Sequence, residues 1–169
     1  MRTNRTLTWL RRAAFVFAAA AAPVVWALDA GAPAPALALP GLKDTVDLAS
    51  LKGKVVYVDF WASWCGPCKQ SFPFMNELQS RYGAAGLEVV AVNLDARRDD
   101  ADRFLAEVPA RFTVAFDAKG ESARHFEVKA MPSSVLIGRD GKVVAAHKGF
   151  KDGDRKALEE RIAQLVAAH

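Results

Sequence analysis

Apolar and polar positions alternate along the chain in blocks of strand length and of helical spacing. Residues 55–61 and 87–93 are continuous apolar runs, rich in β-branched and aromatic side chains, and they predict two strands buried on both faces of a sheet. Between them, residues 69–82 repeat apolar side chains at helical spacing and end before a glycine, which predicts a helix. Strand, helix and strand in this order predict a right-handed parallel crossover.

The remainder of the chain predicts shorter elements around this unit. Residues 41–48 indicate a short hairpin or an edge strand, and Asp140-Gly141 suits the tight turn of a later hairpin. The other predicted elements are helices at 97–107, 120–126 and 154–166 and strands at 112–116, 133–137 and 143–147. A parallel unit followed by a hairpin and a closing helix predicts an α/β fold, in which helices flank both faces of a mixed central sheet.

The first 27 residues have the layout of a secretory signal peptide. Four arginines come first, and an Ala/Val/Phe-rich run follows at residues 13–27. Small residues favour cleavage after Ala27, with Ala30 as a second position. The apolar run is shorter than the roughly twenty residues of a membrane span and contains Pro23, so cleavage is favoured over the alternative of an uncleaved anchor.

Without this leader, the chain is expected to be one electrically neutral domain behind a short tether. Residues 28–40 are rich in alanine and proline and predict a flexible tether, which leaves residues 41–169 as the domain. Removing residues 1–27 lowers the number of basic residues from 23 to 19, equal to the number of acidic residues. The neutral chain therefore gives no support for nucleic acid or an anionic membrane surface as its partner. Export predicts a periplasmic protein, either released or tethered to the inner membrane.

Both cysteines of the chain stand in Trp64-Cys65-Gly66-Pro67-Cys68, after the first buried strand and before the helix. Cys65 is thereby placed at a helix N-terminus, where unpaired N–H groups and the macrodipole favour a thiolate, so its pKa is expected to lie below about 8.5. Cys68, one turn further on, is expected to be less exposed and to attack a Cys65–substrate disulfide. A metal site is not predicted, because the pair supplies two ligands and no third Cys or His lies at metal spacing.

Residues 58–69, Val-Asp-Phe-Trp-Ala-Ser-Trp-Cys-Gly-Pro-Cys-Lys, closely resemble the active-site stretch of thioredoxin. Met131-Pro132-Ser133 resembles the cis-proline loop of that family, and Lys148-Gly149-Phe150 resembles its glycine turn. The leader, the N-terminal hairpin and the extra segment 95–116 are similar to the exported TlpA/ResA/CcmG-like branch. The resemblance covers about residue 40 to the C-terminus and implies a thioredoxin fold with an N-terminal hairpin and a central insertion.

The resemblance also implies a substrate groove and a proton acceptor. Pro132 is expected to be cis and to present the Met131 backbone to an extended substrate beside Cys65. The groove residues implied are Trp64, Gly66, Pro67, Met131, Pro132 and Gly149, whereas Phe60 and Trp61 are expected in the core. Asp59 matches the buried acid of thioredoxin. Its apolar strand is expected to raise its pKa, and we expect it to accept the Cys68 proton.

Two positions depart from the family pattern. Ser71 stands where the exported branch often has a glutamate, and Ala91 stands where thioredoxin has a lysine near its buried acid. Both departures concern the movement of the Cys68 proton.

These features predict a protein-disulfide reductase whose only redox group is the Cys65–Cys68 disulfide. The Cys-Gly-Pro-Cys form implies a reductant that acts on disulfides of other exported proteins, and the resemblance implies that a membrane electron donor of the DsbD/CcdA type recharges it. Nothing in the sequence indicates an obligate dimer, so we expect a monomer. Apocytochrome c and copper-site thiol pairs are candidate substrates. Two alternatives stay open: a disulfide-forming oxidant, and a binding module that holds Cu(I) between the two thiolates.

Overall fold

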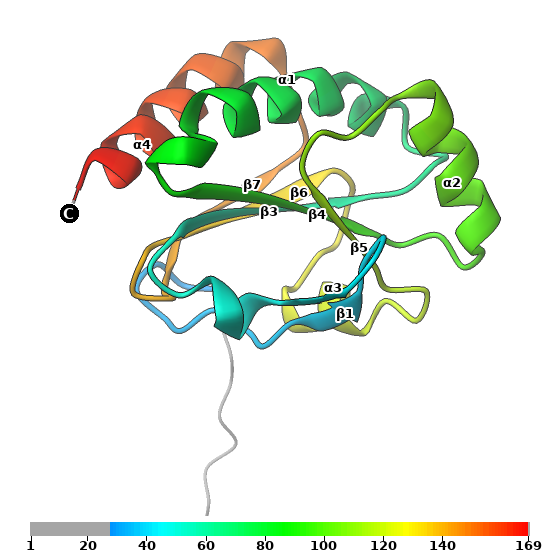
Figure 1. The fold of residues 1–169 in the computed structure, drawn as a ribbon, viewed down its shortest axis with the longest axis horizontal. Coiled ribbons are helices and arrows are strands. Elements are labelled where there is room, and N and C mark those ends of the chain that lie inside the picture. The colour runs from blue at the N-terminus through cyan, green and yellow to red at the C-terminus, as the bar shows by residue number, and fades with distance from the viewer. Residues whose placement is uncertain (1–27, 169) are drawn as a thin grey trace, which may run out of the picture.

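The computed structural model describes residues 28–168, so the predicted signal peptide and its alternative, an anchor, lie outside the described residues. Figure 1 shows the arrangement of the elements. The strands are β1 (Ala38–Pro40), β2 (Thr45–Asp47), β3 (Val55–Trp61), β4 (Leu87–Asn93), β5 (Thr113–Phe116), β6 (Ser133–Ile137) and β7 (Val143–Lys148). The helices are α1 (Gly66–Tyr82), α2 (Arg98–Glu107), α3 (Glu121–His125) and α4 (Arg155–Ala167), with 3₁₀ turns at Leu48–Leu51, Gly83–Ala85 and Asp152–Asp154. Within residues 28–168, no helix combines the length and apolar character needed to cross a membrane.

The central sheet has five strands in the order β5-β4-β3-β6-β7. Strands β3, β4 and β5 are parallel, while β6 is antiparallel to β3 and β7 is antiparallel to β6. The continuous apolar run of β3 therefore occupies the middle of the sheet, where both of its faces are covered. The thioredoxin-like mixed sheet predicted from the sequence is confirmed.

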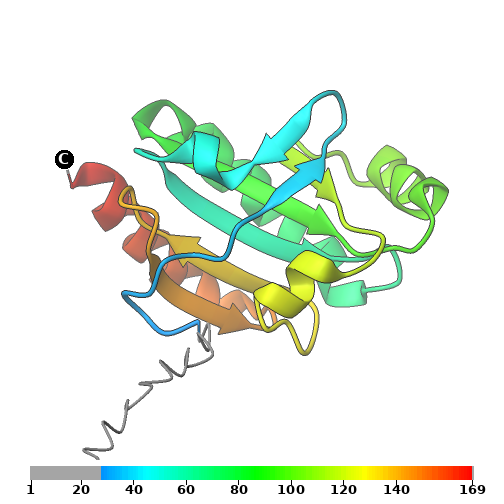
Figure 2. The same cartoon turned by 90° about the horizontal axis from the view of Figure 1, so that it is seen from below.

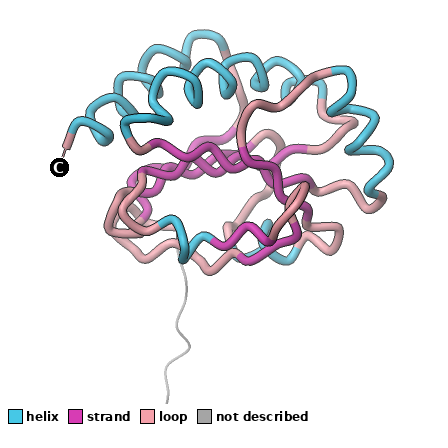
Figure 3. The backbone as a smooth tube through the Cα atoms, in the orientation of Figure 1, coloured by secondary structure: helices cyan, strands magenta, loops and turns pink. Residues whose placement is uncertain are grey.

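Helices and loops cover the sheet as two unequal layers. In Figure 1, α1 and α4 run side by side over one face, and α3 and the β1–β2 hairpin lie over the other, as the view from below in Figure 2 also shows. The tube in Figure 3 shows the central sheet as a layer of strands between these two, with the strands of the hairpin in the lower layer. Alternate side chains of β3 enter different cores: Tyr57 and Trp61 pack under α1, and Val58 and Phe60 pack on the hairpin side.

The segment 28–40 differs from the flexible tether that its composition predicts. Gly31 N–H donates to the Val143 carbonyl over 2.8 Å, and Ala34 N–H donates to the Gly141 carbonyl over 3.0 Å. Leu37 is 4% exposed, and residues 38–40 form β1. The segment therefore packs on the sheet as part of the folded domain.

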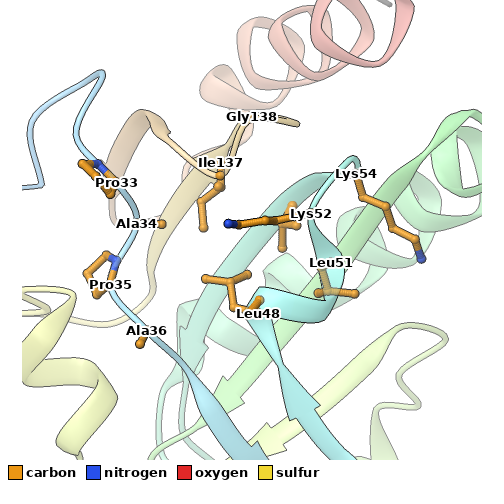
Figure 4. Close-up of a pocket in the computed structure, with 13 residues that line it drawn as sticks. Pro33, Ala34, Pro35, Ala36, Leu48, Leu51, Lys52, Lys54, Ile137 and Gly138 are labelled. Atoms are coloured by element: carbon orange, nitrogen blue, oxygen red, sulfur yellow. The ribbon is translucent and has the colours of Figure 1, made fainter.

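The reason for this difference is visible in a pocket beneath the segment (Figure 4). Residues 33–36 line one wall of this pocket, and Leu48, Leu51 and Ile137 contribute apolar side chains to it. Alanine and proline are common in linkers, but they are also apolar. Proline, which has no N–H to donate, is tolerated beside a sheet edge. Burial of these side chains therefore outweighs the local preference for a flexible chain.

Candidate active site

The two cysteines lie at the N-terminus of α1, directly after β3 ends at the edge of the sheet. Cys65 is the N-cap residue, and Pro67 lies in the first turn, where its missing N–H costs no helical hydrogen bond. The sulfur atoms form a disulfide with an S–S distance of 2.07 Å. Cys68 N–H donates to Cys65 Sγ over 3.3 Å, so the Cys65 sulfur occupies the position of a capping acceptor.

The cysteines differ in exposure as the sequence predicts. Cys65 is 5% exposed, whereas Cys68 is completely buried in the core under α1. A thiolate at Cys65 would be stabilised by the Cys68 N–H and by the positive end of the α1 dipole. The outer sulfur can therefore be attacked first, and the inner sulfur is held within bonding distance of it.

Trp64 stands out beside the disulfide because its large apolar side chain is 71% exposed. The preceding aromatic residues, Phe60 and Trp61, are completely buried, in agreement with their predicted place in the core. Gly66 and Pro67 are exposed on the other side of Cys65. An apolar surface next to a reactive sulfur is suited to contact with another protein chain.

The Met131–Pro132 peptide bond is cis, as predicted, and lies at the start of β6. Ser133, the next residue, pairs with Phe60 of β3, which places Pro132 near the end of β3 from which the cysteine loop leaves. Gly149 N–H donates to the Pro132 carbonyl over 2.8 Å, and its φ of +82° is a conformation that favours glycine. The sheet register therefore brings the proline loop and the glycine turn together.

Asp59 lies in the middle of β3 and is 2% exposed. Since side chains alternate along a strand, Asp59 shares the α1 face with Tyr57 and Trp61, the face on which Cys68 is buried. Its Oδ2 atom has no hydrogen-bond partner. Burial raises the pKa of Asp59 well above its usual range, as predicted, because the surroundings disfavour the charged form.

The two departures from the family pattern can be followed in the structure. Ala91 lies directly opposite Asp59 on β4 and is completely buried, so no cation approaches the carboxyl from that strand. Ser71 is also buried, and its hydroxyl donates to the Cys68 carbonyl over 3.0 Å. The hydroxyl of Ser71 is thus committed to the backbone of α1.

Sequence reasoning missed an acidic residue that supports the cysteine loop. Asp95, 6% exposed, accepts hydrogen bonds from Ser63 N–H and Ser63 Oγ, both over 2.9 Å, and from Asn93 Nδ2 over 2.7 Å. It thereby ties the residue before Trp64 to the end of β4. Asn93 and Asp95 are polar residues at the carboxyl end of a buried parallel strand, and this position was the available signal.

Within residues 28–168, no cluster of three or more His, Cys, Asp or Glu side chains could hold a metal ion. The described side chains around the disulfide instead provide one outer sulfur, one inner sulfur and one buried carboxyl. Such a set can perform thiol–disulfide exchange, in which two thiols and a proton acceptor are needed.

Comparison with known proteins supports the same chemistry. The chain matches the Redoxin family over residues 29–162. It is 33% identical over 140 residues to thiol-disulfide oxidoreductase ResA of Bacillus thuringiensis subsp. konkukian, which covers 82% of this chain and 80% of that protein. A crystal structure from Chlorobium tepidum, assigned as thiol:disulfide interchange protein DsbE, has a TM-score of 0.81 and 56% identity, with 83% of this chain and 99% of that chain covered.

A third relative is the exposed lipoprotein thioredoxin of Streptococcus pneumoniae strain TIGR4. Its crystal structure has a TM-score of 0.68 and 27% identity, with 78% of this chain and all of that chain covered. Together with the paired cysteines at the start of α1, these matches leave no doubt about the family. The chain belongs to the Redoxin family, and it is a protein-disulfide oxidoreductase of the ResA- and DsbE-like kind with Cys65 and Cys68 as its cysteine pair.

Proposed function

We propose that this protein is an exported reductant that transfers two electrons from its reduced cysteine pair to disulfides of other exported proteins. The observation that carries the proposal is the position of Cys65 at the N-cap of α1, where the Cys68 N–H points at its sulfur. This arrangement favours the thiolate that a reductant needs as its attacking group. The Cys-Gly-Pro-Cys form, which resembles that of thioredoxin, supports the direction of electron flow.

The reaction proceeds in two exchange steps. The Cys65 thiolate attacks one sulfur of the substrate disulfide, forms a mixed disulfide and releases the first substrate thiolate. The Cys68 thiol then loses its proton, and its thiolate attacks Cys65 Sγ, which releases the second substrate thiolate and forms the Cys65–Cys68 disulfide. The two released thiolates take up protons, so the substrate gains two electrons and two protons.

Asp59 accepts the Cys68 proton in the second step, directly or through a water molecule. Its burial on the α1 face, the unpartnered Oδ2 atom and its raised pKa support this role. A carboxyl with a raised pKa is a stronger base than a free carboxyl, so it can take a proton from a thiol and release it again. If Cys68 titrates identically in Asp59→Asn and in the wild type, Asp59 has no part in this transfer.

The substrate binds in an extended conformation between Trp64 and the Met131–Pro132 loop. The exposed indole, the cis bond and the Gly149 turn support this groove, and Gly66 and Pro67, which are exposed beside Cys65, would also contact the substrate. Replacing Trp64 with alanine should slow the reduction of a protein disulfide about tenfold and leave the reduction of a small disulfide nearly unchanged. Equal slowing of both substrates would contradict a binding role for Trp64.

Export to the periplasm, by a cleaved signal or on a retained anchor, is supported by the arginines and the apolar run before residue 28. An exposed lipoprotein among the similar structures supports export in general. The electron donor would then be a membrane protein of the DsbD/CcdA type. Apocytochrome c and copper-site thiol pairs, as disulfides of exported proteins, are the candidate acceptors, and the chain acts as a monomer.

The reduction potential of the Cys65–Cys68 couple tests the proposal. Equilibration with defined dithiothreitol or glutathione buffers should give a value near that of thioredoxin, about −270 mV, together with reduction of insulin disulfides. A value near that of the oxidant DsbA, about −120 mV, would reverse the proposed direction of electron flow. Tight stoichiometric Cu(I) binding without insulin reduction would identify a copper-binding module instead. Cys65→Ser is the control that removes the attacking thiol.

A further inference from the structure

A row of polar side chains crosses the sheet from Asp59 to the surface. The register pairs Asp59 of β3 with Ser134 of β6, and it pairs Ser134 with His147 of β7. Residues directly opposite one another in antiparallel strands point to the same face, with Cβ atoms about 4.5–5.5 Å apart. Asp59, Ser134 and His147 therefore lie in line on the face that α1 and α4 cover.

The outer end of this row reaches solvent beside the start of α4. His147 Nε2 is itself buried and lies 3.3 Å from Asp154 Oδ2, while the two side chains are 41% and 43% exposed. An imidazole can accept a proton at one nitrogen and donate one from the other. His147 thus turns its buried nitrogen toward Asp154, and the rest of its ring is within reach of water.

At the inner end of the row, the buried Asp59 carboxyl has polar neighbours on one side only. Ser134 is 3% exposed and lies near the Tyr57 hydroxyl, and burial raises the Tyr57 pKa, so this hydroxyl stays protonated. On the other side of Asp59, β4 offers only the methyl group of Ala91. The polar neighbours of the carboxyl therefore lie toward β6 and β7 and not on β4, where Ala91 stands in place of thioredoxin's lysine.

Other charged groups around His147 are engaged elsewhere. Arg155, which follows Asp154, forms ion pairs with Glu77 over 3.0 Å and with Asp152 over 3.7 Å. Lys148, the next residue along β7, pairs with Ser133 in the register and so points to the opposite face of the sheet. Asp154 is therefore the charged group that faces His147.

We propose that Ser134 and His147 form the route by which protons pass between Asp59 and solvent. The inference rests on the proposed role of Asp59 as acceptor of the Cys68 proton. After Cys68 has given up its proton, the Asp59 carboxyl passes it to Ser134 Oγ through a bridging water molecule, and the Ser134 hydroxyl passes its own proton outward to His147 in the same way. His147 releases a proton to water or to Asp154, so one proton enters the row at Asp59 and one leaves it at the surface.

Nuclear magnetic resonance of the ¹³C-labelled Asp59 carboxyl in the oxidised full-length protein tests this route. In the wild type, the protonated and ionised forms should exchange fast enough to give one resonance that moves with pH. Ser134→Ala and His147→Gln should each slow this exchange at least about tenfold, since a positioned proton carrier contributes factors of that size or more. The double variant should be no slower than the slower single variant, because both residues act in series.

Matched controls separate a relay from a structural effect. His125→Gln replaces an exposed histidine on α3 and should leave the exchange rate unchanged. Added imidazole should restore exchange in His147→Gln, whose site opens to solvent, and not in Ser134→Ala, whose site is buried. Ser134→Thr, which keeps the hydroxyl, should retain the wild-type rate.

Two results would overturn the proposed route. One is a wild-type exchange rate in both Ser134→Ala and His147→Gln, and the other is slow exchange in His147→Gln that imidazole does not restore. If Ser134→Ala does not fold, the exchange rates of the Asp59 carboxyl in His147→Gln with and without imidazole still test the route. A wild-type rate of the second exchange step in Asp59→Asn would remove the proposed role of Asp59, whereas the resonance measurement would still report on the route itself.

Discussion

Replacing Asp59 with asparagine should change how the stability of the oxidised protein depends on pH. Burial raises the pKa of the Asp59 carboxyl, so the folded protein still holds this proton at pH values where the unfolded chain has released it. Between the unfolded pKa, about 3.9, and the raised folded pKa, the native state binds one proton more than the unfolded state. The contribution of Asp59 to the free energy of unfolding is therefore complete below the unfolded pKa and is lost as pH rises through the folded pKa.

The size of the effect follows from the single proton involved. Because the native state binds one extra proton within that window, the free energy of unfolding falls by about 1.4 kcal/mol for each unit by which the pH rises. Asparagine does not titrate, so the stability of Asp59→Asn relative to the wild type should increase with this slope from about pH 4 and level off above the folded pKa. Both cysteines are in the disulfide and do not titrate, which keeps the comparison to one group.

Urea denaturation at half-unit steps from pH 4 to pH 9 measures this difference. Other groups with shifted pKa values are present in both proteins, so their contributions cancel when the two free energies are subtracted. Asp44→Asn, at an exposed carboxylate with no ion pair among the described residues, is the matched control and should follow the wild type at every pH. A difference between Asp59→Asn and the wild type that stays constant over this range would refute a raised pKa for Asp59.

Three further predictions concern the chemistry and the stability of the fold. Cys68→Ser should accumulate a mixed disulfide between Cys65 and a protein substrate, detected by mass spectrometry without reductant, because the second exchange step has lost its thiol. Asp117→Ala should lower the free energy of unfolding by about 1–2 kcal/mol at pH 7, as measured in urea, because Asp117 accepts hydrogen bonds from the first N–H groups of α3. Burial opposes the ionisation of Asp117, but the hydrogen bonds from Ser122 and the backbone outweigh it and lower its pKa. The difference in free energy of unfolding between Asp117→Ala and the wild type should therefore vanish as pH falls through that lowered pKa. Arg139→Ala should lower the free energy of unfolding by about 2 kcal/mol. The guanidinium donates to four backbone carbonyls, which lie before the start of β3, at the end of α4 and in the turn before β4. A decrease below a few tenths of a kcal/mol would contradict this role.

The core of the fold and the reactive sulfurs could be predicted from local sequence. The apolar runs of β3 and β4 can be satisfied only inside a sheet, and the helix between them places Cys65 at a helix N-terminus wherever the unit lies in space. The cis bond before Pro132 followed from the family resemblance of its loop. These features depend on residues close in the chain or on a motif that is itself contiguous.

The packing of residues 28–40 could not be predicted in this way. Their alanines and prolines have the composition of a linker, and only the edge of β7 and the apolar pocket beneath them provide a surface to bury. A local preference for an extended flexible chain was outweighed by contacts with residues more than a hundred positions away, such as Val143. Tertiary burial therefore decided where the domain begins.

The surroundings of the site were also decided by tertiary structure. Asp95 supports the cysteine loop through Ser63, 32 positions earlier in the chain. His147 lies in line with Ser134 and Asp59 only because β6 lies between β3 and β7. Sequence alone determined which residues carry the exchange chemistry, because the spacing of the two cysteines is local. Which polar groups support that chemistry depends on strand order and register, which bring together side chains that are far apart in the sequence.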